Sequence, residues 1–455
     1  MNKPLETNLS DIAQKVLDLA KRGGADEAEV FIERSSSTTV FVKDQAIENL
    51  TAKDTSGLGL RVLSGSALGF GSSNRFNQAS IEKLVMDTIA CAKGSSPDEF
   101  NCFAESKAPA EIDLQIFDKN VQSAPLDDKI KRGLLLESSA RAFDRRIKRT
   151  AYIVYGDGVS TTGVFNTRGV AYQFSASSSQ GVSWVAALDG KDTESGLAED
   201  ASTNYSKLDC EAIGREAAQK AVALLGGEKV QSGKMPVILD GRTVGEFLDF
   251  FSRLISADSV QKGKSMLAGK LGQKIASSNI SIFDDGLLIG GLQSAPVDGI
   301  GYPQQKTVVI ENGELKTFVY DCYSGKKGNM PSTGNARRES YRSRPIVGTT
   351  NFYIERGETG REDLLAEMGK GILITSIRGL FAGLDVATGD FSIPAQGMAI
   401  QSGKADHPVK DFQISGNLFK MLTDVLLVGD ELVWSNAGRY GAPDILVKEL
   451  SIAGS

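Results

Sequence analysis

Apolar residues recur with two different spacings along the N-terminal half of this 455-residue chain. Repeats of three and four residues predict helices over 8–22, 79–93, 125–144 and 207–225. Alternation of apolar and polar residues predicts strands over 28–34, 38–43, 57–63, 67–71, 148–155, 159–165, 169–176 and 180–188. The strands come in pairs between the helices, which favours hairpins in a mixed sheet.

The C-terminal half shows fewer helical repeats and clearer hairpins. Residues 236–239 predict a short buried strand, 242–256 a helix and 445–453 a final strand. In 306–321, Asn312-Gly313 separates two alternating runs, and Asn-Gly tolerates the positive φ angles of a tight hairpin turn. A second predicted hairpin spans 390–415 and turns at 402–404.

This pattern predicts an α+β fold with largely antiparallel sheets in two domains. The segment 226–234, GGEKVQSGK, has glycine, serine and charge without apolar periodicity, as linkers do. We therefore expect an N-terminal α+β domain over 1–227 and a hairpin-rich domain over 228–455. Gly57, Gly59, Gly69 and Gly71 lie within a predicted hairpin, so we assign them to turns and bulges rather than to a nucleotide-binding loop.

Composition restricts the possible chemistry. The chain has a single histidine, His407, so a zinc site with two histidines cannot be built from it alone. The four cysteines form no CxxC pair, which favours a reducing cytoplasm over a disulfide framework. The net charge of −6 argues against non-specific nucleic-acid binding. The start of the chain predicts no signal segment, and no apolar run has the ~18 residues of a membrane span.

Several short motifs could serve chemistry, and each has a structural alternative. Ser324 and Lys327 match a serine-lysine nucleophile pair, although Ser324 also suits a helix cap. Asp385 and Asp390 could form an acid/base pair or shape a turn. His407 is interpreted as a surface turn residue. The basic segment 335–344, NARRESYRSR, could bind peptide or anions, contact nucleic acid directly, pair with acids such as Glu339, or stay solvated.

Several longer segments resemble the TldD/PmbA family, whose members are described as candidate modulators of DNA gyrase. They occur in the family's order at 284–301, 310–321, 332–341, 388–418 and 428–432, with sequences that include DDGLLIGGLQSAPVDGIG, STGNARRESY and QGMAIQSGK. The N-terminal half agrees more loosely, through its paired strands and GLGLRV. The resemblance implies a fold shared with a family of zinc peptidases.

The family contains a subunit that binds zinc through a His-Glu-x-x-x-His helix and a later cysteine, and a PmbA or TldE kind without these residues. By resemblance, the two histidine positions here are Gly241 and Glu246, the general-base position is Arg242, and the cysteine position is Ala437. None of the four matches the zinc-binding kind. We therefore expect no catalytic residue, no bound metal and no cofactor in this chain.

The resemblance implies a non-catalytic subunit that binds unfolded, extended peptide and pairs with a zinc-bearing TldD-like subunit, with itself, or with both. Candidate peptide-binding residues are Arg242, Asn335, Arg337, Arg338 and Tyr341. Strand addition would let such a site accept varied sequences, because main-chain hydrogen bonds supply most of the binding. Two alternatives remain at this point: a homodimeric peptide-binding protein without a peptidase partner, and a metal-independent hydrolase using Ser324 and Lys327.

Overall fold

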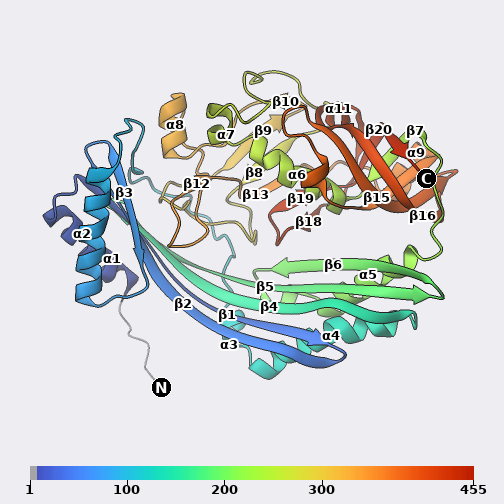
Figure 1. The fold of residues 1–455 in the computed structure, drawn as a ribbon, viewed down its shortest axis with the longest axis horizontal. Coiled ribbons are helices and arrows are strands. Elements are labelled where there is room, and N and C mark those ends of the chain that lie inside the picture. Colours follow the sequence, from blue (N-terminus) through green and yellow to red (C-terminus); the bar gives the residue numbers. More distant parts are fainter. Residues whose placement is uncertain (1–7, 455) are drawn as a thin grey trace.

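The computed structural model describes residues 8–454, in which we find three six-stranded sheets and one two-stranded sheet. One large sheet forms the N-terminal half, and the others form the C-terminal half above it (Figure 1). Residues 1–7, part of the segment expected to contain no signal peptide, lie outside the described residues. In the described part of the chain, no helix is long and apolar enough to cross a membrane.

The N-terminal sheet is antiparallel throughout and has the order β3-β2-β1-β4-β5-β6. Its strands are β1 (Glu27–Lys43), β2 (Ala46–Ser64), β3 (Ala67–Ser73), β4 (Ile147–Asn166), β5 (Ala171–Asp189) and β6 (Asp192–Ser202). The predicted breaks within β1, β4 and β5 are wrong, because the hydrogen-bonded pairing continues through their polar middles. β6 was not predicted from the sequence.

Helices cover one face of this sheet at both of its ends. α1 (Leu9–Arg22) and α2 (Gln78–Gly94) pack on one end, and α4 (Leu126–Phe143) and α5 (Cys210–Ala223) pack on the other. A short α3 (Lys119–Ser123) and a 3-10 turn (Tyr205–Lys207) lie in the connections. The opposite, concave face turns toward the C-terminal half (Figure 1).

The glycines of the β2–β3 hairpin have a different role from the predicted one. The hairpin itself is confirmed, but Gly57 and Gly59 lie in the middle of regular pairing, not in turns or bulges. A Cβ on Gly57 would lie 2.3 Å from the ring of Tyr341, and one on Gly69 would lie 2.2 Å from the carbonyl oxygen of Thr88. Glycine is therefore needed for the close approach of other segments.

Two strand systems build the C-terminal half. One sheet contains β10 (Glu314–Leu315), β9 (Lys306–Glu311), β8 (Ile282–Asp285), β13 (Asn351–Ile354), β19 (Tyr440–Ala442) and β18 (Val433–Ser435), in that order. The other contains β16 (Lys404–Asn417), β15 (Asp390–Gln401), β14 (Gly371–Ile377), β7 (Gly233–Leu239), β20 (Ile445–Ala453) and β17 (Val425–Val428). Because β16 also pairs with β20, five of these strands close into a small barrel.

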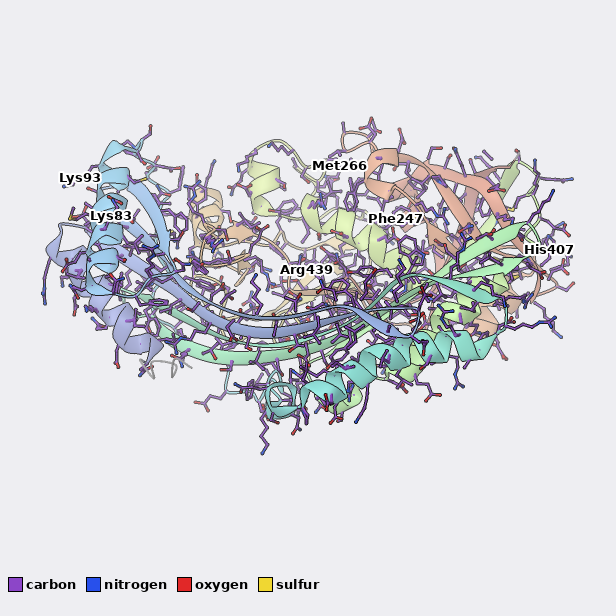
Figure 2. All side chains as sticks on the ribbon, turned by 60° about the horizontal axis from the view of Figure 1, so that its bottom comes forward. Lys83, Lys93, Phe247, Met266, His407 and Arg439 are labelled. Carbon is purple, nitrogen blue, oxygen red and sulfur yellow. The ribbon has the colours of Figure 1, made fainter. Side chains whose placement is uncertain are left out.

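Short elements complete this half. The small sheet pairs β11 (Ala336–Arg337) with β12 (Ile346–Val347). The helices are α6 (Gly241–Leu254), α7 (Ala257–Gln261), α8 (Cys322–Gly328), α9 (Arg361–Met368), α10 (Leu380–Gly383) and α11 (Leu418–Thr423). α6 lies between the two strand systems, and its phenylalanines belong to the largest apolar core of the molecule. Figure 2 labels one of them, Phe247.

Both predicted hairpin turns are confirmed. Asn312 and Gly313 have φ values of 48° and 84°, and Ser402 and Gly403 have values of 51° and 74°. The first hairpin is shorter than predicted, because its second strand contains only Glu314–Leu315. Helices and largely antiparallel sheets together confirm the predicted α+β fold.

The predicted linker 226–234 connects the two halves but is not without partners. The backbone N–H of Glu228 donates to Pro408, and the carbonyl of Glu228 accepts from Lys410 at 3.1 Å. Lys410 also forms ion pairs with Asp192 and Glu194 of β6. The linker segment is therefore hydrogen-bonded to β16, and the domain division at residue 227 stays a prediction.

Candidate functional site

The degenerate metal-site positions begin at the first turn of α6. Asp240 caps this helix by accepting a hydrogen bond of 2.8 Å from the backbone N–H of Thr243. The N–H of Gly241 donates to Asp444 at 2.9 Å, and Arg361 holds that carboxylate with two hydrogen bonds. The start of α6 is thus fixed by polar contacts, and none of them requires a metal ion.

Two glycines bring α6 close to the β18–β19 pair. A Cβ on Gly241 would lie 2.3 Å from the carbonyl oxygen of Ala442. A Cβ on Gly245, one turn later, would lie 2.4 Å from the hydroxyl of Ser435. A side chain at position 241 therefore has no room unless the backbone of β19 moves.

Arg242 occupies the general-base position and joins the two halves of the molecule. Its Nη1 lies 3.2 Å from Oε1 of Glu199 on β6, and its Nη2 donates to the carbonyl of Glu199. Its Nε is buried and has no hydrogen-bond partner in the described part of the chain. The N–H of Asn436 also donates to Glu199 at 3.2 Å. This contact places the turn that contains Ala437 next to the first turn of α6.

The last two positions cannot complete a ligand set. Burial, followed by the nearby charge of Asp240, raises the pKa of the Glu246 carboxyl to about 7, against the opposing effect of Arg242. Ala437 has a positive φ of 53° and lines a cavity of about 450 Å³. Glu246 is thus the one position of the four with an oxygen ligand to offer.

These residues do not fit a zinc ion. A protein zinc site uses three or four nitrogen, sulfur or oxygen ligands. Gly241 and Ala437 provide none, and the guanidinium of Arg242 repels a cation. Among residues 8–454, no three histidine, cysteine, aspartate or glutamate side chains are grouped to bind a metal. We therefore derive no reaction step through zinc in this chain.

The basic segment 335–344 lies against the N-terminal sheet through Arg338 and Tyr341, and three of its candidate residues are buried. Asn335 is 1% exposed, and its side-chain amide donates a hydrogen bond of 2.5 Å to the carboxylate of Asp284. The side chain of Arg338 is 1% exposed and pairs with Glu29. Tyr341 is 5% exposed and packs on Gly57. Arg338 thus follows the alternative of pairing with an acid, and the acid is Glu29.

Glu29 is the central acid of this contact. It is fully buried in β1 and accepts two hydrogen bonds from Arg61, of 2.9 and 2.6 Å. Its Oε1 also accepts from Arg338, whose guanidinium stacks over Phe31. One buried carboxylate thus joins β1 and β2 to the basic segment. A single negative charge is shared by two guanidinium groups.

Arg337 has different surroundings from its neighbour Arg338. Its Nη2 donates a hydrogen bond of 2.6 Å to the amide oxygen of Gln293, which is neutral. Burial and the nearby charge of Arg439 lower the pKa of Arg337 to about 10. In Figure 2, Arg439 lies between the N-terminal sheet and α6. Arg337, Arg338 and Arg439 all line a cleft of about 970 Å³ between the two halves.

The cleft is polar and is lined from both sides. The N-terminal half contributes Arg61, Asp98 and Cys102, and the C-terminal half contributes α6 and the basic segment. It lies next to the 450 Å³ cavity: Asp249 lines the larger space, Asn436 lines the smaller one, and their side chains approach to 3.4 Å.

Sequence reasoning did not identify Glu29, Glu199, Asp249 or Arg439 as site residues. A glutamate in the apolar strand AEVFI is a signal for Glu29, since a buried carboxylate requires a partner.

The other predicted chemistry has no support in the geometry. Ser324 is fully buried, and its hydroxyl forms a capping box with Asp321 at the start of α8. The neighbouring Lys327 lies over the ring of Phe100, 6.0 Å from its centre. The serine-lysine alternative is therefore wrong, because Ser324 is neither accessible nor bonded to the lysine.

The remaining acids and the histidine have structural roles. Asp385 accepts from Ala387 and Thr388, and Asp390 accepts from Asn417, so both shape a turn. His407 is a 38% exposed surface residue beside Asp406, far from Arg439 in Figure 2. These interpretations agree with the structural alternatives that the sequence favoured.

Models of one protein family match three consecutive parts of the chain. The PmbA/TldA metallopeptidase domain 1 matches 28–92, the central domain matches 119–225 and the C-terminal domain matches 232–454. A Haemophilus influenzae protein named metalloprotease PmbA homolog is 28% identical over 100% of this chain and 98% of its own length.

Two solved structures have the same fold. A Thermotoga maritima protein described as a candidate modulator of a DNA gyrase superposes with a TM-score of 0.90 at 26% identity, and the match covers 98% of this chain and 100% of that protein. TldE from Thermococcus kodakarensis superposes with a TM-score of 0.90 at 23% identity, covering 97% and 100%. At 23% identity, the second match bears on the fold alone.

Proposed function

Because this chain belongs to the PmbA/TldA metallopeptidase family, the TldD/PmbA family that its motifs resemble, we propose that it is a non-catalytic subunit of a peptidase. In this proposal it binds unfolded peptide, while a zinc-bearing TldD-like subunit performs the cleavage. The observation that carries the proposal is the first turn of α6. There, Gly241 is packed against Ala442, and Arg242 is paired with Glu199.

The retained surroundings of that turn support a binding role. α6, the β18–β19 pair and the turn at Ala437 still come together, although no ligand set remains among them. The concave sheet leaves a cleft of about 970 Å³ and a cavity of about 450 Å³ against the C-terminal half. Spaces of this size accommodate peptide side chains.

Two edge strands beside the smaller cavity make an extended peptide the best-fitting ligand. β6 and β18 are each the last strand of their sheets, and residues of both line the smaller cavity. An edge strand has unpaired N–H and C=O groups that an added strand can bind. Binding through the main chain explains acceptance of many sequences. The peptide would run beside Glu199 and Ser435.

The free cysteines fit a cytoplasmic setting for this function. Cys91, Cys102, Cys210 and Cys322 form no disulfide in the described residues. Unfolded peptides are the substrates that such an assembly would meet there.

A reconstitution experiment tests the proposal. An unstructured fluorogenic peptide is incubated with this chain, with the zinc-bearing family subunit of the same organism, and with both. We expect no turnover by this chain alone and faster turnover by the mixture than by the partner alone. A mixture containing a partner variant without its general-base glutamate is the control and should be inactive.

The same samples test the assembly. Light scattering should detect a complex that contains both chains. A homodimer that binds peptide and ignores the partner would support the stand-alone binding protein instead. Turnover by this chain alone, unaffected by a chelator and retained after further purification, would contradict the proposal.

A further inference from the structure

Two partly buried guanidinium groups in the large cleft, those of Arg337 and Arg439, have no carboxylate bonded to them. The Nη2 of Arg337 donates to Gln293, a neutral acceptor. Arg439 forms no ion pair and no side-chain hydrogen bond with any residue in 8–454. In the same cleft, Arg61 and Arg338 share the carboxylate of Glu29. The same cleft thus contains arginines that are bonded to a carboxylate and arginines that are not.

The acids nearest to Arg337 are already bonded to other groups. Asp284 accepts from Asn335 at 2.5 Å and from the N–H of Thr350 at 2.6 Å. Asp298 accepts only from backbone N–H groups, including that of Ala336 at 3.0 Å. Both acids reduce the local positive charge without forming a salt bridge. Two guanidinium forks therefore remain free to bind an external anion.

The position of the pair suggests which anion this is. Arg439 follows the turn that contains Asn436 and Ala437, which line the smaller cavity beside edge strand β18. A strand bound there would have its end near the large cleft. Other acids line that cleft, among them Asp249, Asp258 and Glu339, so a generally acidic peptide is disfavoured. A terminal carboxylate is present in every peptide, whatever its sequence.

We infer that Arg337 and Arg439 bind the C-terminal carboxylate of the peptide. The inference rests on the proposed function and names the end of the substrate that the large cleft recognises. A guanidinium fork donates two parallel hydrogen bonds to a carboxylate, which a lysine cannot reproduce. The hydroxyls of Ser252 and Tyr440, 3.2 Å apart, line the same space, and that of Ser252 donates to the carbonyl of Asp249.

Fluorescence polarisation with matched peptides tests this assignment on the full chain. The probes are one unstructured, fluorescein-labelled peptide with a free C-terminus, the same peptide with a C-terminal amide, and the amide with one internal Gln→Glu change. We expect the free acid to bind roughly 10- to 100-fold more tightly than either amide.

The variants identify the residues that make the distinction. Arg439→Gln should remove most of the preference for the acid, and Arg337→Gln should do the same. Arg344→Gln is the matched control, because Arg344 lines the same cleft but is exposed. It should keep the preference. Thermal melts of each variant show whether the fold is intact. If Arg337→Gln has a lowered melting temperature, the binding measurements on Arg439→Gln alone decide the assignment.

Each other outcome contradicts the inference. Equal binding of acid and amide would overturn it and leave the proposed peptide binding intact. Recovery of affinity by the internal glutamate would assign the pair to acidic side chains and overturn the terminal assignment. A preference unchanged in Arg439→Gln would also overturn it. Failure of all three probes to bind would overturn the proposed peptide binding as well.

Discussion

The first turn of α6 and the basic segment 335–344 both belong to the family resemblance, yet their charges have different surroundings. In α6, Arg242 is 17% exposed and pairs across the two halves with Glu199, which is 30% exposed. In the basic segment, Arg338 and its partner Glu29 are 1% and 0% exposed. The first pair can be changed with modest loss, whereas the second is part of the folded core.

Adjacent residues of the basic segment extend this contrast. Arg338 turns toward Glu29, whereas Arg337 turns toward the cleft and Gln293. Arg337 is the last residue of β11, and Arg338 directly follows the strand. A cluster of arginines in a sequence can therefore contain structural and ligand-binding members at successive positions.

The largest effect should come from the buried contact. Glu29→Gln leaves Arg61 and Arg338 buried without their shared carboxylate. We expect a loss of about 3–5 kcal/mol in the free energy of unfolding. Chemical denaturation followed by circular dichroism measures this loss. Glu211→Gln is the control, since its pair with Arg215 is more than half exposed on both sides, and it should cost at most about 0.5 kcal/mol.

A cost near that of the control would mean that the basic segment does not hold the two halves together. The contrast between the two regions would then fail.

A smaller effect should come from the crowded start of α6. Gly241→Ala places a Cβ against the carbonyl of Ala442, and we expect a loss of about 1–3 kcal/mol in the free energy of unfolding. Gly94→Ala is the matched control, because it ends helix α2 and its Cβ would meet nothing within 4 Å. Alanine should stabilise that position by up to about 1 kcal/mol.

If Gly241→Ala were as stable as the wild type, position 241 would have room for a side chain. The explanation for the missing first ligand would then be wrong.

The smallest effect should appear in the pH dependence. The pKa of Glu246 is raised to about 7 by burial, so the folded state binds a proton that the unfolded state releases. This stabilisation is complete at acidic pH and is lost as the pH rises through about 7. Glu246→Gln should raise the free energy of unfolding at pH 8 by about 1–2 kcal/mol relative to wild type and have little effect at pH 4.

Denaturation curves at both pH values measure this difference. An equal effect of the substitution at pH 4 and pH 8 would show that Glu246 titrates normally.

Much of the fold could be predicted from the sequence, because long amphipathic helices and tight turns have local causes. The helix predicted over 8–22 is α1, and both hairpin turns lie at the predicted glycines. β6 was missed because its buried side includes Gly196 and Ala198, which have small or no side chains where α5 packs. Strand alternation is visible in a sequence only when the buried residues are large and apolar.

The candidate site was less predictable, because its contacts join distant parts of the chain. Arg338 and Glu29 are 309 residues apart, and no local pattern relates them. The positions Gly241, Arg242, Glu246 and Ala437 came from the resemblance, and the structure brings the turn at Ala437 next to α6. Arg439 was missed because its unpaired state depends on the absence of nearby carboxylates, a property of the folded structure alone.

Zinc binding tests the central claim most directly. The full chain is purified without chelators, incubated with excess zinc, desalted and measured for zinc by elemental analysis. The zinc-bearing family subunit treated in the same way is the positive control. The account predicts far less than one zinc per copy of this chain and a melting temperature unchanged by a chelator. One tightly held zinc per chain, removed by a chelator with a fall in melting temperature, would contradict it.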